Sequence, residues 1–134
     1  MSEKYTFDSE AIIAFYLDEE GAELVEDLLK QVQRGVAEGY VNVINLTEIY
    51  YILSRVNPEL AEETERKLRL LGLEIVAVED YGLWREAAKI KAKHALSLAD
   101  AFAVATAKVF KTKLVAGSDR EFNKQNVQLI RIRK

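Results

Sequence analysis

The chain of 134 residues contains no cysteine and only one histidine, His94. The absence of thiols excludes a disulfide framework, a zinc ribbon and a cysteine nucleophile. A single imidazole also excludes any metal site that needs two or more histidines. Oxygen atoms must therefore supply most ligands of any metal site, and oxygen ligands suit Mg²⁺ or Mn²⁺ better than Zn²⁺ or copper.

Linkers and membrane spans are also missing from the sequence. One proline, six glycines and no low-complexity run leave no visible linker, and 49% hydrophobic residues suffice for a buried core. We therefore expect one domain over residues 1–134. No apolar run approaches the roughly 20 residues of a membrane helix, and the first residues include Glu3 and Lys4 rather than a signal peptide. These features predict a cytoplasmic protein without a membrane anchor.

Positive charge is outnumbered overall but unevenly distributed. The net charge of −3 argues against nucleic-acid binding when it is taken as an average. Residues 1–83 contain 7 Lys or Arg against 18 Asp or Glu, a net −11, whereas residues 84–134 contain 12 against 4, a net +8. A basic C-terminal part can supply a phosphate-binding face on an acidic protein. For any single lysine, an ordinary solvated surface position is the simpler interpretation.

Hydrophobic patterns predict strands and helices in alternation. Strands are expected at 4–8, 40–44, 73–78, 113–116 and 127–132, and helices at 9–17, 22–36, 46–56, 59–71, 81–94 and 97–110. Ser9 is expected to cap the first helix, and Gly72 to end the fourth. The order β-αα-β-αα-β-αα-β-β predicts an α/β three-layer sandwich with a mainly parallel central sheet of about five strands.

Four carboxylates fall near the carboxyl ends of the predicted strands, where sheets of this class form their sites. Asp8 ends the first strand, Glu48 lies in the first turn of the helix after the second, and Asp119 follows the fourth. Asp100 lies in the first turn of its helix and reaches the same edge only if that helix begins there. Repulsion among four such acids is usually offset by a bound cation or by raised pKa values.

Each acid also has a purely structural interpretation. The runs 45–48 and 97–100 both fit a capping box, in which the acid returns to the backbone of the first residue. Asp8 can start the helix behind it, and Asp119 suits a turn. For Glu48 and Asp119 taken singly, the structural interpretation is the better one, but for the four acids together it weakens.

Apolar residues flank the four acids: Phe7, Ala11, Ile12, Ile49, Leu98, Ala101 and Phe102. A wall of low dielectric constant strengthens the attraction between carboxylates and a cation and excludes bulk water. The expected chemistry is hydrolysis of phosphodiester bonds by water that a metal ion activates. No Walker loop, GxGxxG or GxSxG motif is present. His94, at a basic helix end, fits a favourable charge at that terminus better than a catalytic base.

These segments resemble the four motif blocks of the PIN-domain family. The blocks are Phe7-Asp8-Ser9, Asn45-Leu46-Thr47-Glu48, the run SLADAFAVATA at 97–107, and Ser118-Asp119-Arg120-Glu121-Phe122. They occur in order over nearly the whole chain, and the third block is the most specific. Within the family, the sequence most resembles the VapC-type toxins of bacterial and archaeal toxin–antitoxin pairs.

The resemblance implies an endoribonuclease that depends on Mg²⁺ or Mn²⁺, is usually a homodimer and is blocked by an antitoxin protein. It assigns Asp8, Glu48, Asp100 and Asp119 to the acidic site, with Asp8 and Asp100 as the main metal ligands. Polar residues beside these acids are then expected to contact the RNA substrate: Ser9, Thr47, Ser118 and Arg120.

Two departures from the family pattern bear on the metal site. Glu121 stands where many members carry another aspartate, which would weaken the binding of a second metal ion. Glu10 places an unusual charge beside the first motif.

Other interpretations of the sequence remain. A PIN fold that binds RNA or a partner without cleavage is one, although the four intact carboxylates count against it. A receiver-like signalling domain also gathers acids at strand ends, but it usually has an acidic pair where this chain has Asp8 and Ser9. A structural subunit whose acids only cap helices is the third. Tyr16, Tyr50 and Tyr51 fit either a dimer interface or an ordinary core.

Overall fold

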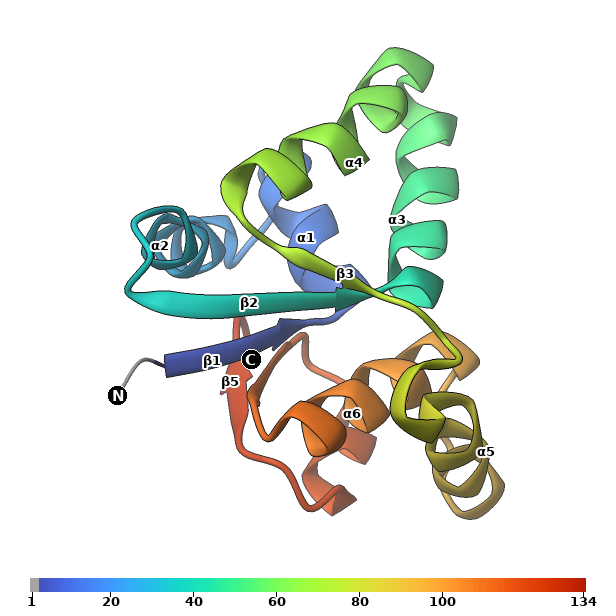
Figure 1. Cartoon of the computed structure of the whole chain (residues 1–134). Coiled ribbons are helices and arrows are strands. Elements are labelled where there is room, and N and C mark those ends of the chain that lie inside the picture. Colours follow the sequence, from blue (N-terminus) through green and yellow to red (C-terminus); the bar gives the residue numbers. More distant parts are fainter. Residues whose placement is uncertain (1–2) are drawn as a thin grey trace.

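The computed structural model describes residues 3–134 of the chain (Figure 1). Its elements are, in order, β1 (Glu3–Phe7), α1 (Ser9–Tyr16), α2 (Ala22–Gln33), β2 (Ala37–Asn42), α3 (Val43–Val56), α4 (Pro58–Leu71), β3 (Glu74–Val76), α5 (Leu83–Lys93), α6 (Leu98–Phe110), β4 (Lys113–Ala116) and β5 (Leu129–Arg131). Two short 3-10 turns, η1 (Asp80–Gly82) and η2 (Arg120–Lys124), precede α5 and follow β4. The observed order agrees with the predicted alternation of strands and helix pairs.

The five strands form one sheet in the order β3-β2-β1-β4-β5, and every neighbouring pair is parallel. This arrangement confirms the predicted α/β class. The chain builds outward from β1 to β2 and β3, and then crosses to β4 and β5 on the other side of β1. The strand order therefore reverses between β1 and β4, and a crevice is expected at the carboxyl ends of these two strands.

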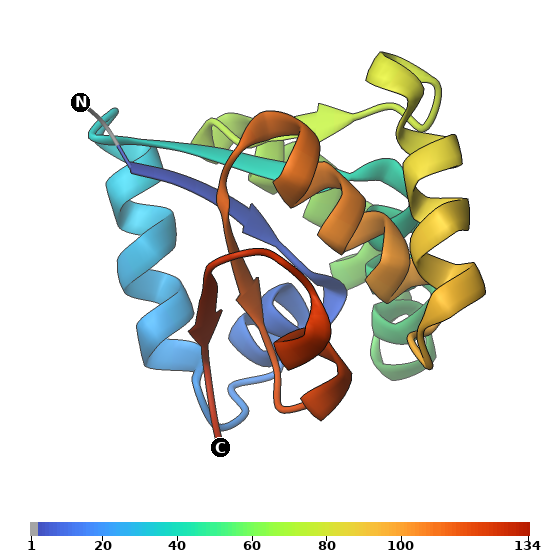
Figure 2. The same cartoon turned by 90° about the horizontal axis from the view of Figure 1, so that it is seen from below.

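Helices cover both faces of the sheet and make three layers. Val115 of β4 joins a core formed with α1 to α4, whereas its neighbours Leu114 and Ala116 join a second core formed with α5 and α6. Figure 1 shows α1, α2 and α4 above the strands and α5 and α6 below them. Figure 2 shows α6 across the opposite face, with α5 beside it. No helix within residues 3–134 is long and apolar enough to cross a membrane.

Some predicted boundaries are wrong by several residues. The strand predicted at 40–44 is β2, which ends at Asn42, and α3 begins directly after it. Val41, Val43 and Ile44 are β-branched and suggest a continuing strand. The Asn42 side chain between them accepts the N–H of Ile44 at 2.9 Å and starts the helix instead. β3 is only three residues long, and α2 ends at Gln33. Gly72 does end α4, in the left-handed conformation that favours glycine.

Candidate active site

The four predicted acids share one cleft at the reversal of strand order. Asp8 follows β1, Asp119 follows β4, and Asp100 lies in the first turn of α6. The cleft has a volume of about 500 Å³ and is lined by Asp8, Glu10, Ile13, Glu19, Glu48, Ile52, Ser97, Asp100, Ser118, Asp119 and Phe122. The amino end of α6 therefore reaches this edge of the sheet, as the prediction for Asp100 required.

Asp8 is the most firmly held of the four, with only 1% of its surface exposed. Its Oδ1 accepts a hydrogen bond from the backbone N–H of Ala11 at 2.8 Å, and its Oδ2 accepts a longer one from Gly117 at 3.4 Å. Burial raises the pKa of Asp8 to about 8, and repulsion from Asp100 and Glu10 adds to the rise, while the two amide hydrogen bonds oppose it. The fold therefore fixes this carboxyl group rigidly while disfavouring its charge.

Asp8 and not Ser9 is the N-cap of α1, so the predicted cap was placed one residue too late. The start of α6 was predicted correctly. Ser97 is its N-cap, and its Oγ accepts the N–H of Asp100 at 3.1 Å. The Ser97 side chain therefore caps the helix, and Asp100 lines the cleft together with the other acids.

Asp100 is half-buried in the cleft and carries the second perturbed carboxyl group. Burial is the largest cause that raises the pKa of Asp100, to about 6. A hydrogen bond with the Ser97 side chain opposes the rise, and repulsion from Glu48, Asp119 and Glu10 adds to it. Glu48, Asp119 and Glu10 line the same cleft as Asp100, and this proximity explains why their negative charges raise its pKa.

Glu48 and Asp119 are less constrained. Because α3 begins at Val43, Glu48 lies in its second turn rather than the first, and the predicted capping box at 45–48 is wrong. Asp119 is exposed, and its Oδ1 accepts the N–H of Glu121 at 2.9 Å, which caps η2. Both side chains lie nearer to solvent than Asp8 and can adjust their rotamers toward a ligand.

Asn45 joins the three helices that carry these acids. It is fully buried, and its Nδ2 donates to Ser9 Oγ in α1 and to the carbonyl oxygen of Ala99 in α6, both at 3.0 Å. The Ser9 hydroxyl in turn donates to the Asn45 carbonyl oxygen at 3.4 Å. These bonds hold the amino ends of α1, α3 and α6 together and so position Asp8 and Asp100 relative to each other.

The four residues expected to contact substrate are dispersed by the fold. Ser118 lines the acidic cleft, and Arg120 lines a neighbouring basic groove that also includes Ser118. Ser9 is buried in its hydrogen bonds with Asn45 and does not line the cleft. Thr47 lies in a separate groove between α3 and α4, where its hydroxyl donates to a backbone carbonyl of its own helix. Proximity in sequence to an acid therefore does not predict a place in the cleft.

Glu10 and Glu19 line the cleft but were not predicted as site residues. The Glu10 carboxylate lies against Gly117, in the space that a Cβ at position 117 would occupy. A glycine at this position therefore makes room for Glu10 beside Asp8. The sequence did signal an unusual charge at Glu10. Glu19, which is 11 residues from Asp8, gave no signal because only the turn after α1 brings it back to the cleft.

Glu121, noted for replacing a frequent aspartate, does not line the cleft. Its carboxylate forms an ion pair with Lys124 at 2.8 Å. His94 is the C-cap of α5, in agreement with its expected place at a helix end, and it does not line the cleft either.

The cleft concentrates negative charge, and among the described residues Glu19 is the one lining acid in an ion pair, a loose one with Arg133 at 3.7 Å. Six acids line the cleft, and among residues 3–134 no Lys or Arg forms an ion pair with Asp8, Glu48, Asp100 or Asp119. Carboxylate oxygens are the ligands that hard divalent cations prefer. The donor set therefore fits Mg²⁺ or Mn²⁺ in its chemistry.

The carboxylates share the cleft but do not converge on one point. Within the described part of the chain, no three acidic or histidine side chains are close enough to hold one ion as they stand. For the acids to share one ion, the less constrained side chains of Glu48 and Asp119 would have to move toward the fixed carboxyl group of Asp8.

Comparison with protein families identifies the fold. Residues 5–127 match the PIN domain model, and the chain belongs to the PIN-domain family. Members of this family are nucleases, which supports hydrolysis of nucleic acid as the chemistry of the acidic cleft. No curated protein sequence is significantly similar to the chain.

Solved structures share the fold at low sequence identity. VapBC2 from Rickettsia felis, bound to a DNA fragment from its promoter, has a TM-score of 0.71 and 15% identity, over 96% of this chain and 98% of that chain. A toxin–antitoxin complex from Klebsiella pneumoniae has a TM-score of 0.69 and 15% identity, over 94% and 95%. FitAcB from Neisseria gonorrhoeae has a TM-score of 0.72 and 18% identity, over 96% and 97%. This chain is therefore similar in fold to these proteins over almost its full length.

Proposed function

We propose that this protein is an endoribonuclease that depends on a divalent metal ion and hydrolyses RNA phosphodiester bonds. One observation carries the proposal. Asp8 and Asp100 have raised pKa values in a cleft that they share with four further acids, and among the described residues no Lys or Arg forms an ion pair with Asp8, Glu48, Asp100 or Asp119. Such clustering is unfavourable by itself and becomes favourable when a cation binds. Membership of the PIN-domain family supports a nuclease, and the resemblance to VapC-type toxins supports RNA as its substrate.

Asp8 and Asp100 would be the main ligands of the ion, with Glu48 and Asp119 completing the site. When bound, Mg²⁺ or Mn²⁺ would supply Lewis acidity, which lowers the pKa of an attacking water and balances charge on the phosphoryl oxygens. Asp8 holds one fixed position through its hydrogen bonds with Ala11 and Gly117. Because the pKa values of Asp8 and Asp100 are raised, binding of the ion would release protons near neutral pH.

The apolar residues of the cleft would exclude water from the site. Ile13, Ile52 and Phe122 line it beside the acids and limit the number of water molecules around the reacting phosphate. A low dielectric constant strengthens the interaction between carboxylates and cation and reduces side reactions. Phe122 is almost completely buried, so this wall is rigid.

We infer that the protein acts as the cytoplasmic toxin of a toxin–antitoxin pair, with a small antitoxin protein as its partner. The inference is supported by the similarity in fold to the VapBC and other toxin–antitoxin structures. A neighbouring small reading frame that encodes a DNA-binding protein would support the pair. Its absence, together with harmless expression of the chain alone, would indicate a housekeeping nuclease instead.

A homodimer is the proposed assembly. Tyr50 and Tyr51 of α3 are 41% and 43% exposed and lie in one groove with α4, where the Tyr50 hydroxyl donates to Glu62. Large aromatic surface of this kind is enriched at interfaces. Tyr16 is half-buried and packs against the core, so it contributes less to this surface.

The nuclease proposal is tested by incubating the purified protein with a mixed RNA pool in Mg²⁺, in Mn²⁺ and in EDTA. We expect internal cleavage with either metal and none in EDTA. RNA that is bound but left intact under all three conditions would favour a PIN fold that binds RNA without cleaving it.

A further inference from the structure

A basic groove adjoins the acidic cleft and shares Ser118 with it. The groove has a volume of about 660 Å³, and its charged lining includes Arg120, Arg131, Arg133 and Lys134, with Glu20 as the acidic exception. We propose that this groove binds backbone phosphates of the RNA next to the scissile bond, with Arg133 and Arg120 as the phosphate ligands. The inference rests on the proposed ribonuclease function and assigns the path of its substrate.

The groove lies next to the acidic cleft, at the end of β5 and beside the segment that follows β4. Arg131 of β5 is in register with Ala116 of β4, and the chain continues from Ala116 to Ser118 and Asp119 at the cleft. Arg120 directly follows Asp119 and opens η2. A phosphate in the groove would therefore belong to a nucleotide close to the one whose phosphate lies among the acids.

The Arg131 side chain already forms hydrogen bonds within the protein. Its guanidinium donates to the carbonyl oxygen of Gly117 and to Asn123 Oδ1, the latter at 2.7 Å, and it lies 5.7 Å from the ring centroid of Phe122. These contacts brace the segment from Gly117 to Asn123, which carries Asp119. Arg131 is thus a positioning residue, and its charge also contributes to the potential of the groove.

Arg133 differs from Arg131, because its guanidinium is largely buried and lacks hydrogen-bond acceptors among the described residues. Its side chain is 19% exposed, and its Nε and Nη2 atoms are buried without a hydrogen-bond acceptor among the described residues. The nearest carboxylate is Glu19, at 3.7 Å from Nη2, which is an ion-pair distance but not a hydrogen bond. Buried charged donors are normally satisfied, and a guanidinium fork matches the oxygens of a phosphate. Arg133 lines the groove with two unsatisfied donors, so a phosphate there would satisfy them if the guanidinium turned outward from its covered position.

A basic groove beside this cleft would favour the binding of RNA to an otherwise acidic site. Six acids line the cleft, and they repel the RNA backbone wherever a metal ion does not compensate them. Positive side chains next to the acids supply the counterion release that drives most binding of nucleic acids. Glu19 lines the cleft and pairs loosely with Arg133, so an incoming phosphate would compete with Glu19 for this arginine.

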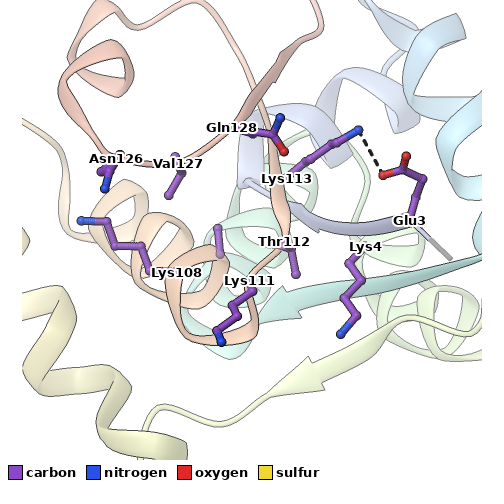
Figure 3. A pocket seen from close by; sticks show the side chains of 10 residues that line it. Glu3, Lys4, Lys108, Lys111, Thr112, Lys113, Asn126, Val127 and Gln128 are labelled. Atoms are coloured by element: carbon purple, nitrogen blue, oxygen red, sulfur yellow. Dashed lines mark ion pairs between the residues drawn. The ribbon is translucent and has the colours of Figure 1, made fainter. Parts of the chain in front are cut away.

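The chain has a second basic hollow, which provides a control. It lies at the amino ends of β1 and β4, the opposite edge of the sheet, and includes Lys4, Lys108, Lys111 and Lys113 (Figure 3). Lys113 is paired with Glu3 at 3.0 Å and Lys4 with Glu38 at 3.7 Å. In Figure 3 the lysine amino groups do not converge on one point. This hollow lacks both the orphaned donors and the proximity to the acids.

The test measures RNA affinity separately from cleavage. A labelled single-stranded RNA pool is titrated in Mg²⁺ with the Asp100→Asn protein, which is expected not to cleave, and with the same protein that also carries Arg133→Gln, Arg120→Gln or Lys108→Gln. Anisotropy gives Kd at several salt concentrations, and thermal melts verify folding. Arg120 is exposed, so Arg120→Gln keeps the test informative if Arg133→Gln unfolds the protein.

We expect each arginine variant to weaken binding about tenfold, in line with the loss of one charge-assisted hydrogen bond. Each should also reduce the slope of log affinity against log salt by about 0.7, the value for one phosphate contact on a single strand. Lys108→Gln should change neither quantity appreciably. In the cleaving parent, the arginine variants should raise KM with little change in kcat.

The two proposals fail in different ways. Equal affinity and equal salt slope for folded Arg133→Gln and Arg120→Gln variants would overturn the groove, even if the parent protein cleaves RNA as proposed. The same loss for Lys108→Gln would also overturn it, because the effect would then be unspecific. Absence of cleavage by the parent would overturn the ribonuclease and leave the affinity measurement to decide on the groove.

Discussion

Replacing Asp100 by asparagine should stabilise the protein in the absence of metal, and by an amount that depends on pH. The carboxyl group of Asp100 is pushed toward its neutral form by burial and by Glu48 and Asp119. An asparagine side chain has nearly the same shape as an aspartate side chain but carries no charge. In the capping bond of α6 the backbone N–H of residue 100 donates to the Ser97 Oγ, so a change of the side chain at position 100 leaves this bond intact.

The magnitude follows from the raised pKa. A shift from 3.8 to about 6 is about two units, and each unit corresponds to about 1.4 kcal/mol. Because Asp100 is only partly buried, solvent screening reduces the resulting ~3 kcal/mol to about 1–2 kcal/mol. The folded wild type binds the extra proton, so its stability falls as pH rises from about 4 to about 6 and then levels off with respect to this group. The advantage of Asp100→Asn should therefore be absent near pH 4 and complete by pH 7.

The assay is a thermal melt in EDTA at pH 4 and at pH 8. At an unfolding entropy of about 2.1 cal/mol/K per residue, 1–2 kcal/mol raises Tm by about 4–7 °C at pH 8. Asp27→Asn, an exposed acid on α2, is the matched control and should shift Tm far less. A variant that melts below wild type at pH 8, or one with the same advantage at both pH values, would refute the reasoning.

Three further outcomes are expected. Calorimetry should find Mn²⁺ affinity at least about tenfold weaker in Asp8→Asn, because a neutral amide is a poorer ligand for a hard cation, and unchanged in Asp27→Asn; equal affinities would remove Asp8 from the site. Asn45→Ala should lower the free energy of urea unfolding by about 2–3 kcal/mol, because the Asn45 side chain donates two buried hydrogen bonds; a loss near zero would contradict its joining role. Light scattering at micromolar concentration should give a dimer mass, reduced to a monomer by Tyr51→Glu; a wild-type monomer would argue against the dimer.

The order of elements was predictable because each element carries its own local signal. Short β-rich runs and helical stripes marked the strands and helices, and Gly72 and Ser97 marked the end of α4 and the start of α6. The start of α3 was missed because two asparagines three residues apart both suit a cap. Only the tertiary structure decides between them: Asn42 caps the helix, whereas Asn45 is buried between α1 and α6.

The gathering of Asp8, Glu48, Asp100 and Asp119 in one cleft could be predicted from the sequence, but the rest of the cleft and the surface around it could not. Parallel strands bring their carboxyl ends to one edge, so residues after β1 and β4 were expected to meet there. Thr47 is next to Glu48 in sequence, yet consecutive residues of a helix are about 100° apart, and its side chain lies in another groove. Arg133 gave no signal because its place beside Glu19 depends on the register of β5 with β4.

Cleavage of a mixed RNA pool by wild-type protein, Asp100→Asn and Asp27→Asn, each in Mg²⁺ and in EDTA, tests the central claim most directly. If Asp100 holds a metal ion, wild type and Asp27→Asn should cleave RNA in Mg²⁺ and not in EDTA. Asp100→Asn should be folded, at least as stable as wild type and nearly inactive. Wild-type cleavage that persists in EDTA, or an Asp100→Asn protein as active as wild type, would contradict a metal-dependent nuclease built on these acids.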